Sequence, residues 1–153
     1  MIHSRLAAPE DCRAVFELSN DPVVRAVSFS SKPIPYESHI KWFEARLADP
    51  DCLFVLFYDS GQLAGQVRFA REKGGDQADI SISIAETHRG KGIALEVMRK
   101  ALEYPRQKWR VARIKALVKL DNEASNRYFE KAGYVFSNRS AHDGIDCNVY
   151  FYE

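Results

Sequence analysis

Four consecutive residues between a strand-like and a helix-like segment could bind a phosphate group. Arg89, Gly90, Lys91 and Gly92 place two cations and two glycines side by side. The first amides of a helix have no partner within the helix and favour an anion at the positive end of its dipole. Glycine has no Cβ atom and lets a ligand come close to the backbone. Taken alone, the turn is equally compatible with a phosphate site and with a simple corner whose cations are solvated.

The segments on either side supply the strand and the helix that such a site requires. From Ala78 to Ile84, apolar and polar residues alternate, which is the period of a half-buried strand. From Ile93 onward, apolar residues recur with the helical period, and we expect Pro105 to end that helix. Two other phosphate motifs do not fit, because the third Rossmann glycine and the Walker Ser or Thr are missing.

Composition and charge limit the class of protein. The chain has 153 residues, of which 46% are hydrophobic and 28% charged, and we expect a single domain over residues 1–153. The net charge of +1 gives no strong field that would attract nucleic acid or a membrane. No apolar run approaches the ~20 residues that span a bilayer, and the N-terminus lacks the apolar core of a signal peptide. We therefore expect a cytoplasmic protein without nucleic-acid or membrane partners.

The cysteines and histidines do not form a recognisable metal or disulfide pattern. Cys12, Cys52 and Cys147 are odd in number and widely separated, and the four histidines are scattered. This spacing favours reduced thiols and no metal site.

The remaining chain alternates between strand-like and helix-like segments, which predicts an α/β domain with a mixed sheet. Segment 23–35 is expected to be a loop with one helical turn. Turns at 59–62 and 73–76 make the strands around them an antiparallel meander. The expected strands cover 2–6, 52–58, 63–72, 78–84, 112–119, 134–138 and 145–152, and the expected helices cover 9–19, 36–48, 123–132 and the segment from 93 to about 105.

Two motifs carry a resemblance to a known family. The stretch from Arg89 to Ala94 matches R-x-x-G-x-A and resembles the coenzyme A pyrophosphate signature of the GNAT superfamily of N-acetyltransferases. The stretch from Asn122 to Tyr134 resembles that superfamily's C-terminal motif, N-x-x-A/S-x-x-x-Y/F-x-K-x-G-F/Y. Both follow a predicted strand, and the order of elements is similar over the full chain. The resemblance implies the GNAT fold: a mixed, mostly antiparallel sheet of about seven strands, flanked by four helices and splayed between strands 4 and 5.

The resemblance also implies acetyl-CoA as co-substrate and assigns residues to it. Its diphosphate would bind the glycine turn, and its pantetheine would pair with strand backbone in the splay. A strand amide would polarise the thioester carbonyl while a neutral amine attacks directly in a ternary complex. The implied cofactor-binding residues are Ile82, Ser83, Ile84, Arg89, Gly90, Lys91, Gly92, Ile93, Ala94 and Asn122.

The catalytic acid and base are less directly implied. Many family members place a tyrosine, which can protonate the leaving thiolate, where this chain has Phe129. Tyr128 lies one residue earlier, about 100° around the helix. Either Tyr128 acts through a local shift, or no side-chain acid is used. Asp79 and Glu72 are candidates for a general base that acts through water, and each is equally compatible with a solvated carboxylate.

The acceptor region resembles a more specific group of enzymes. Segments 20–43 and 65–69 are similar to the N-acetyltransferases of pseudaminic and legionaminic acid biosynthesis, which act on UDP-linked amino sugars. The resemblance implies a small-molecule acceptor, a nucleotide sugar, whose base could stack on an aromatic ring and whose diphosphate could meet a cation. The candidates are Phe29 and Trp42 for stacking, although Trp42 could equally be a core residue, and Arg25, Lys32 and Arg68 for the diphosphate.

Two alternatives remain open from the sequence. A Rim-type protein N-terminal acetyltransferase shares the fold and both motifs. A non-catalytic acyl-CoA-binding module is compatible with phenylalanine at position 129. Two chains could also pair through the edge strand near the C-terminus as a homodimer.

Overall fold

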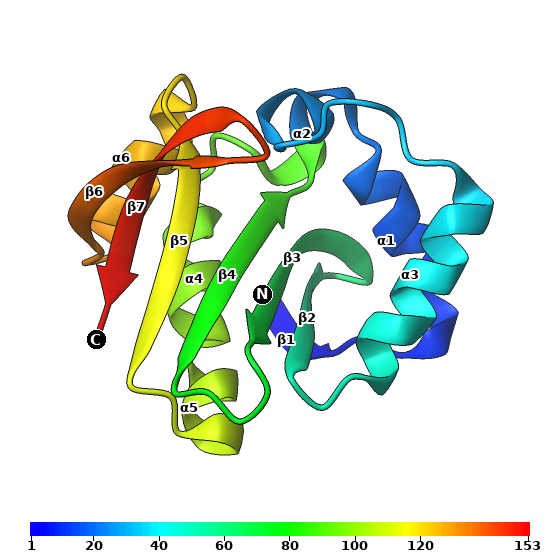
Figure 1. Cartoon of the computed structure of the whole chain (residues 1–153). Helices are drawn as coiled ribbons and strands as arrows, with labels where there is room; N and C mark the ends of the chain where they lie inside the picture. Colours follow the sequence, from blue (N-terminus) through cyan, green and yellow to red (C-terminus); the bar gives the residue numbers. More distant parts are fainter.

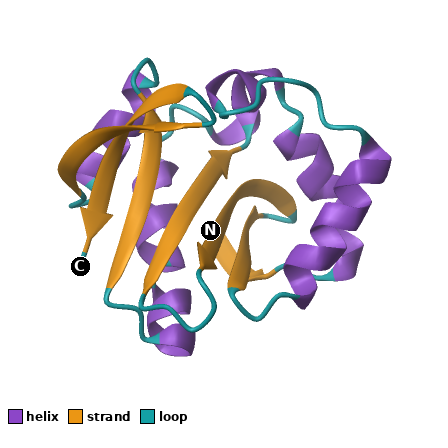
Figure 2. Ribbon diagram, in the orientation of Figure 1, coloured by secondary structure: helices purple, strands orange, loops and turns teal.

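A seven-stranded sheet with helices on both of its faces makes up the protein (Figure 2). The computed structural model describes all residues from Met1 to Glu153. The strands lie in the order β1-β2-β3-β4-β5-β7-β6, and β4 and β5 are the parallel pair in an otherwise antiparallel sheet. This confirms the predicted fold class. The strands are β1 Ile2–Leu6, β2 Cys52–Asp59, β3 Gln62–Arg71, β4 Gln77–Ile84, β5 Arg113–Lys119, β6 Val135–His142 and β7 Ile145–Tyr152.

The parallel pairing of β4 with β5 is short, and the two strands then separate. Their ladder begins at Gln77 with Arg113 and ends at Ile80 with Ala116. From Ser81 to Ile84, β4 continues with β3 as its partner on one side and no strand on the other. The upper ends of β4 and β5 diverge in Figure 1. We call this unpaired edge of β4, residues 81–84, the seam; it is the splay that the family resemblance implies.

Helices cover the sheet because alternate strand residues face opposite sides. Val55 and Phe57 of β2 belong to the larger core, to which α4 also contributes, whereas Phe54 and Leu56 pack with Phe43 of α3. In Figure 1, α4, α5 and α6 lie behind the sheet, and α1 and α3 lie to its right. The helices are α1 Cys12–Ser19, α2 Pro22–Val27, α3 Tyr36–Ala48, α4 Ile93–Ala101, α5 Glu103–Trp109 and α6 Glu123–Lys131, with short 3₁₀ turns at Pro9–Asp11 and Glu86–His88.

Two of these six helices were not among the four predicted from the sequence. The first, α2, is longer than the single helical turn that was expected within the loop 23–35. The Asp21 carboxylate accepts hydrogen bonds from the amides of Val23 and Val24, at 2.9 and 3.2 Å, and Pro22 occupies the first helical position. A carboxylate cap followed by proline is a strong helix start, so this segment is helical rather than a loop.

The second additional helix is α5, and the prediction that Pro105 ends a helix is wrong. Helix α4 ends at Ala101, and α5 begins at Glu103 after the junction residue Leu102. Pro105 lies in the first turn of α5, where a backbone N–H would have no helical partner in any case.

The C-terminal hairpin also differs from expectation. Strand β6 extends to His142, so residues predicted as a polar loop pair with β7, and the turn occurs at Asp143 and Gly144. All eight residues of β6 are exposed, so this strand lacks the alternation of buried and exposed residues that predicts a strand. None of the helices has the length and apolar character that a bilayer crossing requires.

Candidate functional site

A cleft of about 1060 Å³ extends across the seam and joins the two faces of the sheet. One part, which we call the turn half, is lined by Gly90, Gly92 and the first residues of α4 together with α6. The other, which we call the α3 half, is lined by α3, the end of α1, segment 23–34 and the outer face of β3. Ile82, Ser83 and Ile84 line the cleft between the two halves.

The turn half presents backbone rather than side chains. Gly90 and Gly92 have φ values of 72° and 75°, and Gly92 occupies the N-cap position of α4. No side chain caps α4, and a Cβ atom at either glycine would meet nothing within 4 Å. The first amides of α4 are therefore free, beside open space, at the positive end of a nine-residue helix. These features fit a diphosphate.

The seam offers a second set of backbone groups. Ile82 and Ser83 pair with Val67 and Gln66 of β3, and their other edge faces the cleft. A free strand edge can pair with an extended ligand that contains amide groups, as an added strand would. Gly65 lies opposite Ile84, where a Cβ atom would come within 3.1 Å of the Ser83 carbonyl oxygen. The backbones of β3 and β4 can lie this close at the seam because residue 65 has no side chain.

The two cations of the turn have different surroundings. Arg89 donates from Nε to the Ile84 carbonyl at 3.0 Å, and its Nη2 lies 2.9 Å from Asp21 Oδ1. Burial would raise the pKa of Asp21, but the hydrogen bonds from Arg89 and from the amides at the start of α2 outweigh it and hold the pKa below its ordinary value. Arg89 thus ties the turn to α2. Lys91 is exposed and does not line the cleft.

Tyr128 and Phe129 of α6 both line the cleft, and they differ in how deeply they are buried. Tyr128 is half-buried and lines the cleft. Phe129 is 4% exposed, and its ring lies 4.9 Å from that of Tyr134 in the core. Asn122 lines the cleft and also caps α6, because its Oδ1 accepts from the Ser125 amide at 3.2 Å. Of the two aromatic residues considered for the acid, Tyr128 is the one with a hydroxyl at the cleft.

The α3 half contains aromatic rings and an arginine. The Cζ of Arg68 lies 5.0 Å from the centre of the Trp42 ring, and the Trp42 residue is 36% exposed. Burial lowers the pKa of Arg68. Phe29 lines the cleft and contacts His142 edge to face, with ring centres 4.8 Å apart, so the β6–β7 hairpin meets the segment after α2 at the rim. Trp42 is therefore a partly exposed residue of the cleft rather than a core residue.

Arg25 lines the cleft, but its guanidinium is held by the protein. It donates from Nε to the Ser19 carbonyl at 2.8 Å and from Nη1 to the Ser30 carbonyl at 3.0 Å. A third bond, from Nη2 to Ser28 Oγ, is 3.2 Å long. These contacts indicate that Arg25 fixes the path of the chain around α2. Lys32 does not line the cleft.

The carboxylates considered as a general base lie outside the cleft. Asp79 pairs with Ala70 of β3 and Lys115 of β5, within the closed part of the ladder. Burial raises the pKa of Asp79, against the opposing charge of Lys115. Neither Asp79 nor Glu72 lines the cleft, so neither is placed to touch an acceptor there.

Several polar residues that line the cleft, or that pair with a residue lining it, were not among the predicted site residues. Gln66 donates from Nε2 to Ser19 Oγ at 3.2 Å, and its Oε1 is buried without a partner. The His39 Nε2 lies 3.1 Å from the Cys12 carbonyl oxygen. A sequence signal existed for Asp21, since Asp before Pro marks a helix start. None existed for Ser19 and Gln66, because their contact depends on how α1 packs over β3.

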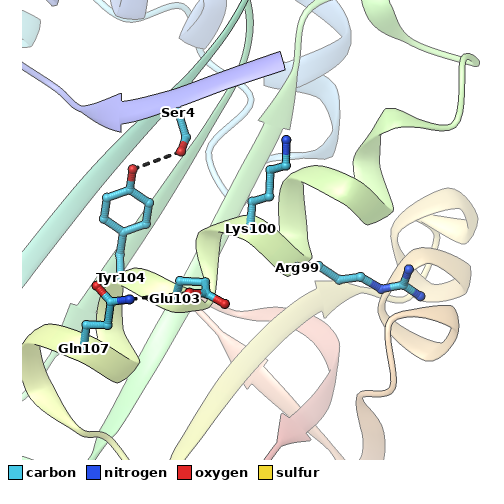
Figure 3. A pocket seen from close by; sticks show the side chains of 6 residues that line it. All are labelled: Ser4, Arg99, Lys100, Glu103, Tyr104 and Gln107. Carbon is cyan, nitrogen blue, oxygen red and sulfur yellow. Dashed lines mark hydrogen bonds between the residues drawn. The ribbon is translucent and has the colours of Figure 1, made fainter. Parts of the chain in front are cut away.

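Two further features bound the site. No group of three or more His, Cys, Asp or Glu side chains is arranged to hold a metal ion, and all three cysteines are free. A second hollow of about 580 Å³ lies between β1, α4 and α5 and shares no residue with the cleft (Figure 3). There the Tyr104 hydroxyl lies 3.0 Å from Ser4 Oγ.

Comparisons with known proteins agree with this geometry. Residues 4–135 match the family model described as an acetyltransferase (GNAT) domain. The Bacillus subtilis (strain 168) protein named "Putative phosphinothricin acetyltransferase YwnH" is 27% identical over 136 residues, covering 86% of this chain and 82% of that protein.

Solved structures with the same fold cover the whole chain. Spermidine N-acetyltransferase from Vibrio cholerae, in complex with CoA and spermine, is 19% identical with a TM-score of 0.88, covering 99% of this chain and 94% of that one. An N-acetyltransferase from Staphylococcus aureus Mu50 is 21% identical with a TM-score of 0.85, covering 100% and 98%.

Proposed function

Because the chain belongs to the GNAT acetyltransferase family, we propose that its acceptor is the primary amine of a nucleotide-linked amino sugar. At the family level, it is an N-acetyltransferase that uses acetyl-CoA as co-substrate. The observation that supports the proposed acceptor is the composition of the cleft. Its α3 half and rim combine the rings of Phe29 and Trp42 with the guanidinium of Arg68, and the whole cleft is lined by a single carboxylate, Asp143.

The turn half suits the co-substrate. We expect the free amides at the start of α4 and the two glycines to hold the diphosphate, and the seam to pair with the pantetheine amides. Acetyl-CoA supplies the acyl group as a thioester, whose thiolate is a good leaving group. An amide of the seam residues Ile82–Ile84 would polarise the thioester carbonyl.

The chain's own residues then orient the acceptor and manage protons. The amine must arrive neutral from the α3 half, its proton passing to water, because no carboxylate of the inner cleft is placed to take it. Formation of the C–N bond breaks the C–S bond. We propose that Tyr128, whose side chain borders the turn half, donates its hydroxyl proton to the departing sulfur. Tyr128 then regains a proton through water from the nitrogen, which loses one proton as it becomes an amide.

A second acceptor class is supported by the relative from Bacillus subtilis. That protein is named for phosphinothricin, an amino acid that carries an anionic phosphinate group. A nucleotide sugar and phosphinothricin share an amine and a negatively charged phosphorus group, which suits a cleft with several cations. A polyamine such as spermine would find one carboxylate, Asp143, at the tip of the β6–β7 hairpin.

Release of free thiol from acetyl-CoA tests these possibilities. The acceptors are a UDP-linked amino sugar, phosphinothricin, spermidine and a short peptide with a free N-terminus. Turnover with the UDP-amino sugar supports the proposal, and turnover with phosphinothricin supports the second class. Exclusive turnover of the peptide would favour a Rim-type enzyme, and saturable acetyl-CoA binding without turnover of any acceptor would favour a non-catalytic module.

A further inference from the structure

Four arginine and lysine side chains line the cleft, and they differ in how the protein satisfies them. Arg25 is held by backbone carbonyls, and Arg89 pairs with Asp21. Lys119 donates to the carbonyls of Ala26 and Ser28, at 3.2 and 3.4 Å. The Arg68 side chain makes no hydrogen bond and no ion pair within the protein, and it contacts the Trp42 ring. Of these four cations, Arg68 is therefore the one available to a ligand.

The surroundings of Arg68 are unfavourable for a cation without a ligand. Burial lowers the pKa of Arg68, whose guanidinium lies over the Trp42 ring, and the nearby positive charge of Arg46 lowers it further. Cys52 beside it offers no counter-charge, because burial raises the pKa of this thiol and keeps it neutral. Arg46 itself has a buried Nε without a hydrogen-bond partner. Desolvated guanidinium groups in proteins are normally paired with an anion, so the surroundings of Arg68 favour an anionic ligand.

Trp42 holds the planar, forked guanidinium group of Arg68 in a fixed position. A guanidinium at 5.0 Å from a ring centre is held by cation–π attraction while its N–H groups stay free to bind other atoms. The planar fork matches two oxygens of a carboxylate, phosphinate or phosphate. The arginine and the tryptophan come from β3 and α3, two of the elements that line the α3 half.

We propose that Arg68, positioned by Trp42, binds an oxyanion of the acceptor and thereby selects amines that carry a negatively charged group. This rests on the proposed function in one respect, that the α3 half receives the acceptor. The shared ligand chemistry is a phosphorus or carboxyl oxyanion, whether it belongs to a nucleotide diphosphate or to an amino acid. Polyamines are then excluded by charge, because the same subsite would repel them.

Binding of UDP, of phosphinothricin and of spermidine tests this, each measured by calorimetry on protein saturated with CoA. Saturation keeps the turn half occupied, so that the anion cannot bind there. We expect Arg68→Gln to weaken binding of UDP or phosphinothricin at least tenfold, and Arg68→Lys to restore part of the affinity. Whichever of the two anions binds wild-type protein identifies the source of the oxyanion. Arg106→Gln is the matched control, because that guanidinium lies 5.3 Å from the Tyr152 ring, outside the cleft.

Three results would overturn the proposal: neither anion binding the wild-type protein, an equal loss in Arg68→Gln and Arg106→Gln, or spermidine binding more tightly than both anions. Thermal unfolding distinguishes a ligand role from a structural one. Removal of a desolvated, unpartnered charge should leave the melting temperature of Arg68→Gln at or above that of the wild type, and a marked fall would also overturn the proposal. Loss of turnover with every acceptor would contradict the proposed function while these binding results still decide the role of Arg68.

Discussion

The two halves of the cleft offer a ligand different kinds of chemical group, namely backbone groups in one half and side chains in the other. In the turn half, the groups available to a ligand are backbone amides of α4 and the free edge of β4, exposed by glycine conformations and by the end of a short ladder. In the α3 half, they are side chains of Arg68, Trp42 and Gln66 on strands and helices of ordinary geometry. A backbone site depends on chain conformation, whereas a side-chain site depends on residue identity. In our proposal, the turn half serves the chemistry common to the family and the α3 half selects the acceptor.

The strongest test of this contrast changes conformation without touching a functional side chain. Gly92→Val should abolish measurable acetyl-CoA binding in calorimetry, a loss of at least ~100-fold, because a β-branched residue cannot readily hold a φ of 75°. Gly61→Val is the matched control, since Gly61 has a φ of 82° in the β2–β3 turn, equally open space and no place in the cleft. Both variants should lose about 1–3 kcal/mol of stability. Equal acetyl-CoA affinity in the two would refute a backbone-built turn half.

A smaller effect is expected from a side chain at the boundary of the halves. Tyr128→Phe should lower kcat about tenfold or more with little change in KM, since a general acid acts on the leaving group rather than on binding. Tyr104→Phe serves as control, because this tyrosine bonds Ser4 in the separate hollow of Figure 3. The measurement is steady-state thiol release with both substrates saturating. Unchanged kcat in Tyr128→Phe, where chemistry limits turnover, would remove this residue from the mechanism.

The smallest expected effect concerns the link between the halves. Asp21→Asn keeps a capping oxygen for α2 but removes the charge that pairs with Arg89. We expect KM to rise about two- to fivefold for both acetyl-CoA and acceptor, which corresponds to the lower part of the roughly 0.5–2 kcal/mol that coupling through such contacts is worth. An effect confined to one substrate would show that the two halves are independent.

The same ion pair predicts a pH dependence. The folded pKa of Asp21 lies below its ordinary value, so the stabilisation is fully present above the ordinary aspartate range of about 4 and is lost as pH falls through the folded pKa. Thermal unfolding of wild type and Asp21→Asn should therefore differ at neutral pH and converge in strong acid. A difference that grows on acidification would contradict this sign.

The sequence predicted the strands and the turn half well, because their signals are local. Alternation from Ala78 to Ile84, two glycines and a helical period are read along a few residues, and the structure places them as expected. The additional helix α5 was missed because Pro105 is an ordinary stop signal, yet one that the first turn of a helix tolerates. Strand β6 was cut short because its eight residues are all exposed and carry no buried alternation.

The α3 half was less predictable because its contacts join distant segments. Arg25, Phe29, Trp42 and Arg68 were all candidates, and all four line the cleft. The guanidinium of Arg25 is bound by backbone carbonyls of the protein, whereas that of Arg68 is not. No sequence pattern could show this difference, because it depends on where those carbonyls point. The cofactor and acceptor assignments of these residues stay predictions.

Because the β4–β5 ladder ends early, selection for thermal stability would favour extending it. Further backbone pairing between β4 and β5 beyond Ile80 and Ala116 would satisfy the unpaired backbone groups of the seam and close the gap between the two strands. Such a variant should tolerate heat better and be inert, because it would itself occupy the row of hydrogen-bonding groups left for its substrate. In this fold, thermal stability and substrate binding therefore depend on the same short stretch of strand backbone.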